Sequence, residues 1–155
     1  MSTDNIEGYV TRAAEAFNEQ DPDAFVSEFT QDGTFLDPLQ EEELSREELR
    51  EYFVAVYEAF PDVRADIHRV AVEEGEFGVE WTMYGTHEGS FEGLPPTGNR
   101  FEISGASVGS VSEDGITFWR DYWDSREFLD QLGLTFPEVL THLPKLAYAR
   151  VRAGE

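Results

Sequence analysis

Hydrophobic residues in the first sixty positions recur every three or four residues, which is the spacing of amphipathic helices. The first such stretch covers residues 4–19 behind Thr3 as a helix cap. Its apolar face carries Ile6, Val10, Ala13, Ala14 and Phe17. Asp21 and Pro22 predict the start of a second, short helix, because aspartate caps helices and proline fits their first turn. The apolar residues of this segment are Ala24, Phe25 and Phe29.

A brief strand and a third helix complete this half of the chain. A turn at 32–33 leads into a strand over residues 34–37. Ser45 and Glu48 have the spacing of a capping box, so a helix is predicted from there to Pro61, which ends it. The apolar face of this helix carries Leu49, Tyr52, Phe53, Val56, Tyr57 and Phe60.

After Pro61 hydrophobic and polar residues alternate, which is typical of β-strands. Four strands are predicted, from 63 to the turn at 74–75, then over 77–87, 101–111 and 116–123. They are followed by a short helix around 128–132 and a helix from Pro137 to Arg150. Helices that precede an antiparallel meander predict an α+β fold, as a single domain over residues 1–155. In it a curved antiparallel sheet packs against the N-terminal helices and encloses an apolar pocket.

The chain is strongly acidic, with 33 acidic residues against 11 basic ones and a net charge of −22. Such a surface repels phosphate backbones and anionic lipids, so we expect neither nucleic-acid nor membrane partners. The acids are spread evenly, and Lys145 is the only lysine. This composition resembles that of cytosolic proteins from salt-accumulating organisms. We interpret it as adaptation to the solvent rather than as an acidic surface for a partner.

The chain contains no cysteine and no run of roughly 18 apolar residues. The residues after Met1 lack the basic and apolar segments of a secretory signal. We therefore expect a cytoplasmic protein without disulfide bonds.

Several standard catalytic motifs are missing from the sequence. Glycine-rich phosphate loops, zinc-protease helices and calcium loops are not found. His68, His87 and His142 lie far apart without ligand spacing, so no metal is expected. With no cofactor predicted, the remaining chemistry is acid/base catalysis by Asp, His and Tyr in an apolar setting, or binding without reaction.

Asp124 is the first candidate for such chemistry. It follows a strand end that is rich in large aromatic residues. A carboxyl that loses solvation there holds its proton more tightly and becomes usable as a general acid or base. The alternative is that Asp124 caps the helix that begins near Ser125, or pairs with Arg120 or Arg126.

Other residues are placed by the same alternation. His87 has the parity of Trp81 along its strand and is expected to face the apolar side, as a proton shuttle or as a hydrogen-bonded core residue. Asp37 ends the first strand, where it is expected either to line the pocket or to form part of a turn. Asp121 has the opposite parity to Asp124 and is expected to face solvent unless the strand is bulged. The residues expected in the core or around any cavity are Phe17, Phe35, Tyr57, Trp81, Tyr84 and Trp119.

Three parts of the chain resemble the SnoaL-like polyketide cyclase family. They are residues 59–62 (AFPD), residues 81–98 (WTMYGTHEGSFEGLPPTG), and a spaced pattern of Asp114-Gly-Ile, Trp119, Asp124 and Gln131-Leu-Gly133. The resemblance covers roughly residues 4–135. It implies the cone-shaped fold of the superfamily of nuclear transport factor two and ketosteroid isomerase, which serves many functions.

The resemblance also implies a cofactor-free pocket in which one aspartate acts as acid and base in an aldol-type ring closure. That aspartate aligns with Asp124, and the GTHxG element brings His87 to the cavity. Characterised cyclases of the family carry a further histidine on the sheet near the aspartate, whereas residues 104–110 contain none.

Two functions follow as hypotheses, both with a small apolar ligand or substrate. In the first, a cyclase- or isomerase-type enzyme, Asp124 abstracts a proton α to a carbonyl, and His87 with Tyr57 or Tyr84 stabilises the enolate. In the second, the same fold binds an apolar metabolite without reaction. A weaker third option is a partner-binding domain that uses the outer face of the sheet. A homodimer is expected in each case.

Overall fold

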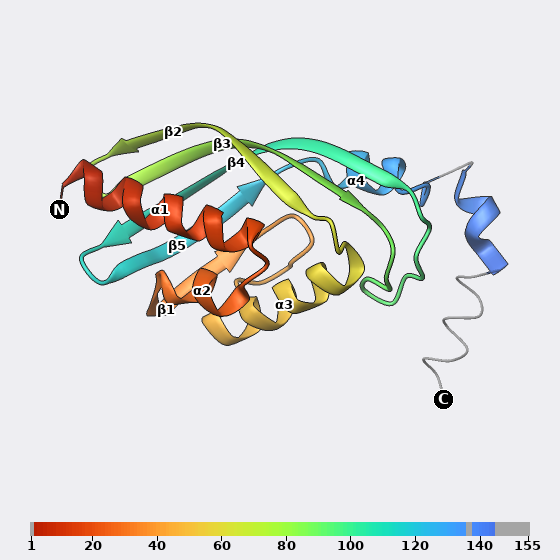
Figure 1. The fold of residues 1–155 in the computed structure, drawn as a ribbon, viewed down its shortest axis with the longest axis horizontal. Helices are drawn as coiled ribbons and strands as arrows, with labels where there is room; N and C mark the ends of the chain where they lie inside the picture. Colours follow the sequence, from red (N-terminus) through yellow and green to blue (C-terminus); the bar gives the residue numbers. More distant parts are fainter. Residues whose placement is uncertain (1, 136–137, 145–155) are drawn as a thin grey trace.

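The computed structural model describes residues 2–135 and 138–144 (Figure 1). Two helices, one strand and a third helix come first and four further strands follow, which confirms the α+β class. The elements are α1 (Thr3–Asn18), α2 (Pro22–Ser27), β1 (Phe29–Leu36), α3 (Arg46–Ala59), β2 (Arg64–Glu73), β3 (Glu76–Thr86), β4 (Arg100–Ser112), β5 (Gly115–Tyr122), α4 (Ser125–Gln131) and the 3-10 helix η1 (Glu138–His142).

The five strands form one curved sheet in the order β1-β5-β4-β3-β2. Figure 1 shows this sheet arching over α1, α2 and α3, which lie together on its inner side. Neighbouring strands are antiparallel except for β1, which runs parallel to β5 at the edge. The predicted antiparallel meander is therefore confirmed for β2 to β5, and β1 adds a parallel edge that the sequence did not predict.

Side-chain caps explain where the helices begin. Ser2 accepts a hydrogen bond from the backbone N–H of Asn5 at 3.3 Å, so the first cap lies one residue before the predicted Thr3. Ser45 Oγ accepts from Glu48 N at 3.2 Å, while Glu48 Oε1 accepts from Ser45 N at 3.1 Å. This reciprocal pair is the predicted capping box.

The core fills the space between the helices and the inner face of the sheet. Its centre is the ring of Phe53, whose centroid lies 5.5 Å from that of Phe17, 4.7 Å from that of Phe25 and 5.7 Å from that of Phe35. These rings meet edge to face, the arrangement that aromatic quadrupoles favour. Helices and sheet are thus joined by interlocked aromatic side chains.

A β-bulge in β5 decides which side chains of this strand face inward. Ser110 pairs with Phe118 but Val111 pairs with Ile116, so β5 has one extra residue at this point. A bulge of this kind reverses the alternation of inward and outward side chains. Ile116 and Trp119 are therefore both buried although they lie three positions apart.

Two segments differ from the sequence prediction. Phe29, expected on the second helix, begins β1 and pairs with Ile116, since α2 ends at Ser27. Of the predicted helix from Pro137 to Arg150, the structure describes residues 138–144, as the 3-10 helix η1 followed by two α-helical residues. Residues 137 and 145–150 lie outside the described residues.

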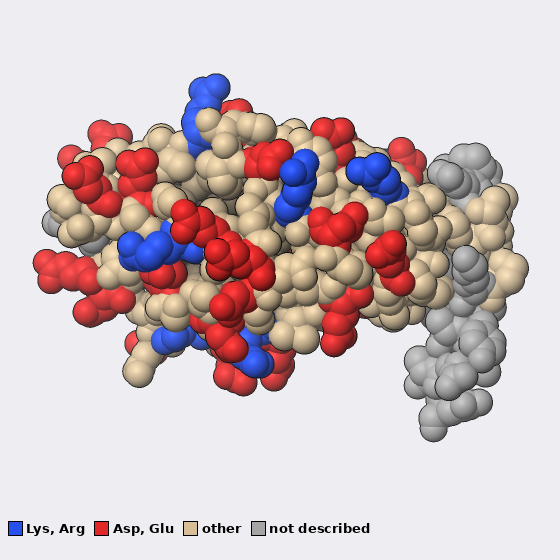
Figure 2. All heavy atoms as spheres, in the orientation of Figure 1, with Lys and Arg blue, Asp and Glu red and all other residues tan. Residues whose placement is uncertain are grey.

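The surface carries the excess negative charge. Figure 2 shows Asp and Glu side chains scattered across the visible face, with fewer Lys and Arg side chains between them. Within the described ranges, no helix combines the length and the apolar composition that a membrane span requires.

Candidate active site

A cavity of about 100 Å³ lies between the inner face of the sheet and the helices. Its wall is formed mainly by aromatic and aliphatic side chains from α1, α2, α3, α4, all five strands and the segments that connect them. All three tryptophans of the chain, Trp81, Trp119 and Trp123, belong to this wall. The predicted apolar pocket is therefore present.

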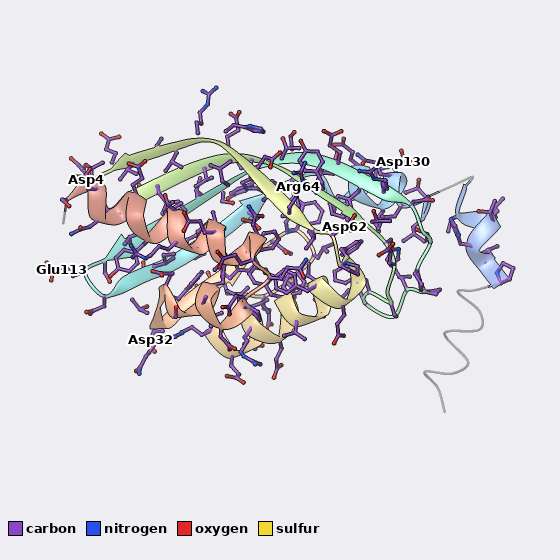
Figure 3. All side chains as sticks on the ribbon, viewed as in Figure 1. Asp4, Asp32, Asp62, Arg64, Glu113 and Asp130 are labelled. Atoms are coloured by element: carbon purple, nitrogen blue, oxygen red, sulfur yellow. The ribbon has the colours of Figure 1, made fainter. Side chains whose placement is uncertain are left out.

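Two acidic side chains, Asp37 and Asp121, interrupt this apolar wall. Most other acids lie at the surface, and Figure 3 shows the labelled Asp32, Glu113 and Asp130 at the outer ends of the molecule. In the part of the chain that the structure describes, no lysine, arginine or histidine lines the cavity. A carboxyl in such surroundings loses hydration without gaining a cationic partner.

Asp121 is held by a chain of hydrogen bonds across the sheet. Trp81 Nε1 donates to Ser107 Oγ at 2.8 Å, and Ser107 Oγ donates to Asp121 Oδ1 at 2.6 Å. Trp119 Nε1 donates to the same Oδ1 at 2.7 Å. Among the described residues none donates to Oδ2 of Asp121. One oxygen of this carboxyl is thus fixed and the other is available in the cavity.

The environment of Asp121 raises its pKa to about 7. The largest cause is burial, which disfavours the charged form, and the negative charge of Asp37 adds to it. Hydrogen bonds from Ser107 and Trp119 act in the opposite direction because they stabilise the carboxylate. A carboxyl with this proton affinity can accept and return a proton near neutral pH.

Asp37 follows β1 and is only 7% exposed. Its Oδ1 accepts a hydrogen bond from Leu39 N at 2.8 Å, and its Oδ2 accepts one from the Tyr52 hydroxyl at 2.7 Å. Burial raises the pKa of Asp37, while these hydrogen bonds partly oppose the rise. Burial and the charge of Asp37 also raise the pKa of Tyr52, so its hydroxyl stays protonated. Unlike Asp121, Asp37 has both oxygens occupied.

The parallel register of β1 and β5 brings the two carboxyls together. Phe35 pairs with Trp119 and Leu36 pairs with Arg120. Asp37 and Asp121 are the next positions on each strand, and both side chains line the same cavity. Strands that are distant in sequence therefore build a pair of acids at one edge of the sheet.

Asp124 lies elsewhere, so its predicted place in the cavity is wrong. It is exposed, and its Oδ1 accepts hydrogen bonds from Arg126 N at 2.9 Å and Glu127 N at 3.2 Å. It is the N-cap of α4, as the alternative interpretation proposed. The bulge reverses the parity counted from Ile116, so Trp119 and Asp121 lie on the inner face, whereas Asp124 lies beyond the end of β5.

His87 is fully buried but does not belong to the cavity wall, so its predicted position is corrected as well. Its ring packs against Phe60, a wall residue, at 5.3 Å between centroids. Its Nδ1 accepts a hydrogen bond from Thr97 N at 3.3 Å, and its Nε2 has no partner in the described chain. Burial lowers the pKa of His87, which favours the neutral ring.

The predicted lining residues divide into two groups. Phe17, Phe35, Asp37, Trp81 and Trp119 line the cavity. Tyr57 and Tyr84 do not. The hydroxyl of Tyr57 donates to the carbonyl oxygen of Phe17 at 3.1 Å, away from the cavity. Tyr84 faces the outer side of β3, where the guanidinium of Arg64 lies 4.7 Å from its ring centre.

Sequence reasoning missed Asp121, Tyr52 and Ser107. Trp119, Asp121 and Trp123 alternate and line the cavity together, so a count that started from Trp119 would have found the aspartate. Nothing local marks Ser107 or Tyr52, because their partners lie 14 and 15 residues away in the sequence. Among the described residues, no three His, Cys, Asp or Glu side chains gather as a metal site.

The curved sheet that closes over helices around an apolar cavity is a ketosteroid isomerase-like fold. The sequence model of the SnoaL-like polyketide cyclases matches residues 8–132, and the chain belongs to this family. Comparison with curated proteins gives no match.

Solved structures share the fold at low sequence identity. AclR from Streptomyces galilaeus, a proposed hydroxylase, is 21% identical with a TM-score of 0.76 over 86% of this chain and 99% of its own. IdmH from Streptomyces antibioticus, a proposed polyketide cyclase, is 23% identical with a TM-score of 0.72 over 83% and 98%. A ketosteroid isomerase-like protein from Catenulispora acidiphila, solved with trimethylamine, is 22% identical with a TM-score of 0.72 over 82% and 93%.

Proposed function

We propose that the protein is a cofactor-independent acid/base enzyme of the cyclase or isomerase type, acting on a small apolar molecule that contains a carbonyl group. Asp121 takes the role that the sequence assigned to Asp124. The observation that supports this proposal is the asymmetry of the Asp121 carboxyl. Its Oδ1 accepts two hydrogen bonds, whereas its Oδ2 receives none from the described residues and lies in an apolar cavity.

The reaction begins when Oδ2 of Asp121 accepts a proton from the carbon α to the substrate carbonyl. The electron pair of the broken C–H bond moves toward the carbonyl oxygen and gives an enolate. In a cyclase the enolate carbon then attacks a second carbonyl, a C–C bond forms, and Asp121 returns its proton to the new alkoxide. In an isomerase the proton returns to another carbon. Asp121 ends each cycle as it began, so no cofactor is consumed.

Asp37 and Tyr52 would act on the developing negative charge. The hydroxyl of Tyr52 remains protonated and lies 2.7 Å from Asp37 Oδ2. When Asp37 is itself protonated, the pair holds two O–H groups beside the cavity, and one can donate to an enolate oxygen. When Asp37 is ionised instead, its charge raises the proton affinity of Asp121, so the two acids have different tasks.

Exchange of α-hydrogens for deuterium tests the proposal without knowledge of the natural substrate. The protein is incubated in D₂O with small ketones and exchange is followed by proton NMR. Asp121→Asn should lower the enzymatic exchange rate by about 100-fold or more, the scale on which a general base contributes. Asp124→Asn keeps a good helix cap and is the matched control. Equal exchange in wild type and Asp121→Asn would overturn the proposal.

A second candidate is a binding protein of the same fold that does not transform its ligand. The pairing of Tyr52 with Asp37 favours this candidate. The Tyr52 hydroxyl already donates to Asp37, so neither group can donate a hydrogen bond to a ligand until Asp37 is protonated. In that case wild type and Asp121→Asn would bind a given ligand with similar affinity, and neither would catalyse exchange.

We also propose that two copies pair through the outer face of the sheet. Val108 and Tyr122 are large apolar side chains on this face that are 42% and 50% exposed. Ala106, the cross-strand partner of Tyr122, is small and leaves the face open for close approach. Light scattering during size-exclusion chromatography should show a dimer for the wild type and a monomer for Val108→Glu.

A further inference from the structure

The hydrogen bonds that reach Asp121 through Ser107 can run in one direction only. The indole N–H of Trp81 donates and cannot accept, so the Ser107 oxygen that it meets at 2.8 Å is the acceptor. The hydroxyl of Ser107 has one hydrogen, and it points to Asp121 Oδ1 at 2.6 Å. Among the described residues this hydroxyl has no other acceptor. Trp81 therefore determines that Ser107 donates to the acid.

The three strands β3, β4 and β5 position this line of contacts. Ser107 is the direct cross-strand partner of Asp121 and is only 1% exposed, so solvent does not compete for its hydroxyl. Trp81 pairs with Gly105 and reaches Ser107 diagonally. A Cβ atom at position 105 would lie 2.7 Å from Cη2 of Trp81. Glycine at this position thus leaves the space in which the indole extends over β4.

These contacts also determine which oxygen of Asp121 carries the proton. Oδ1 accepts from Ser107 and, at 2.7 Å, from Trp119 Nε1, so both of its lone-pair directions are occupied. A proton on Oδ1 would displace one of these donors and leave it buried without an acceptor, which is unfavourable. No described side chain donates to Oδ2. The protonated acid therefore carries its hydrogen on Oδ2.

We propose that Trp81 is a positioning residue, which acts through Ser107 to hold the proton of Asp121 on the oxygen that meets the substrate. The part played by the substrate rests on the proposed function, but the position of the proton follows from the hydrogen bonds alone. When Oδ2 releases its proton, the donors at Oδ1 already face the new negative charge. The carboxyl can therefore give and take a proton without rearrangement of its neighbours.

Titration of the Asp121 carboxyl by carbon NMR tests this inference in the full chain labelled with ¹³C-aspartate. The signal is assigned by its absence from Asp121→Asn. Ser107→Ala should raise the pKa of Asp121 and increase its proton affinity about tenfold, because the carboxylate loses a charge-assisted hydrogen bond. Trp81→Phe should raise the pKa by a smaller factor, because Ser107 stays but its hydroxyl is no longer held in one direction.

The double variant Ser107→Ala/Trp81→Phe tests whether Trp81 acts through Ser107. Its Asp121 pKa should equal that of Ser107→Ala alone, because Trp81 has no separate route to the acid. The double variant removes both polar partners and leaves no buried indole N–H unpaired. If Ser107→Ala does not fold, the double variant should still show a higher Asp121 pKa than Trp81→Phe.

Two control variants separate this effect from general changes in the wall. Trp123→Phe shortens another tryptophan of the cavity whose indole, in the described structure, does not donate to Ser107 or Asp121. Ser104→Ala removes a hydroxyl of the same strand β4 that lies 3.1 Å from the hydroxyl of Thr82 instead. Neither control should raise the pKa of Asp121, and the effect of Trp81→Phe is measured relative to Trp123→Phe.

Infrared spectroscopy tests the position of the proton directly. The difference spectrum between wild type and Asp121→Asn at pH 5 contains the C=O stretch of the protonated acid. With the proton on Oδ2 the carbonyl oxygen is Oδ1, so loss of a donor in Ser107→Ala should move this stretch to higher wavenumber. With the proton on Oδ1 the carbonyl oxygen would be Oδ2, and the stretch would not move.

The inference is overturned if Trp81→Phe leaves the pKa of Asp121 no higher than Trp123→Phe does. A double variant with a clearly higher pKa than Ser107→Ala, or an unmoved C=O stretch in Ser107→Ala, would also overturn it. The proposed function fails separately, because it depends on the effect of Asp121→Asn on deuterium exchange. Shifted titrations without exchange would leave the inference about Trp81 standing and would refute the enzyme.

Discussion

Asp37 and Asp121 occupy equivalent positions at the ends of two parallel strands, one residue beyond the pair Leu36 and Arg120. Both side chains face the same cavity, and the charge of Asp37 is one of the causes that raise the pKa of Asp121. The two acids differ in their hydrogen bonds. Both oxygens of Asp37 accept a bond, whereas Asp121 accepts two on one oxygen. This difference makes Asp121 the group that can exchange a proton with a ligand.

The stability of the protein should fall as the pH rises from about 4 to about 7. The pKa of Asp121 is about 7 in the folded state and near 3.9 in the unfolded chain, so the folded state binds more protons over this interval. Its contribution is complete below pH 4 and is lost by the time the pH passes 7. Asp121→Asn should therefore unfold at higher urea concentration than wild type at pH 8, by roughly 2–4 kcal/mol.

Urea titrations of both proteins at pH 5 and pH 8 measure this difference. The advantage of Asp121→Asn should shrink toward the lower pH, because Asp121 is then protonated in the folded protein. A constant difference between Asp121→Asn and wild type at both pH values would contradict the folded-state pKa.

Trp119→Phe should move the pH profile of deuterium exchange to higher pH. The indole N–H of Trp119 stabilises the carboxylate of Asp121 and lowers its pKa. Phenylalanine keeps much of the ring but loses this donor, so the carboxyl should ionise at higher pH and the rising limb of the profile should follow. The rate is measured from pH 5 to pH 10. An unchanged limb would mean that another group is the base.

Tyr52→Phe should destabilise the folded protein by about 1–2 kcal/mol, because Asp37 loses one of its donors while it remains buried. The pKa of Asp37 should rise further, which carbon NMR of the labelled carboxyl can measure. Tyr57→Phe is the control, since the hydroxyl of Tyr57 donates to a backbone carbonyl and not to either acid. An equal effect of both substitutions on the Asp37 carboxyl would argue against the pairing with Tyr52.

Added salt should stabilise the protein. With a net charge of −22, the folded chain is opposed by repulsion among its carboxylates. Screening shortens the Debye length from about 10 Å at 0.1 M salt to about 3 Å at 1 M. Thermal unfolding in 0.1 M and 2 M NaCl should therefore show a higher Tm in the concentrated solution. A salt-independent Tm would contradict the interpretation of the acidic surface as adaptation to a salty solvent.

Local patterns in the sequence were enough to predict most of the secondary structure. The capping box at Ser45 and Glu48 and the cap at Asp21 are satisfied by atoms within a few residues. The alternation after Pro61 likewise reflects the pleat of each strand by itself. Such patterns also indicate the fold class and the family, because each helix, strand and motif that carries them depends on residues that are close in the sequence.

The site depends on relations between distant residues. One extra residue in β5, between Ile116 and Phe118, reverses the alternation counted from Ile116, so Trp119 and Asp121 face inward. The parallel pairing of β1 with β5 then brings Asp37 alongside, across more than eighty positions of sequence. Bulges and strand register are settled by which side chains the whole core can bury, so they have no local signature. The sequence by itself thus determined the type of fold and the presence of an apolar pocket. Only the tertiary structure, through the bulge and the pairing of β1 with β5, decided that Asp37 and Asp121 share the pocket.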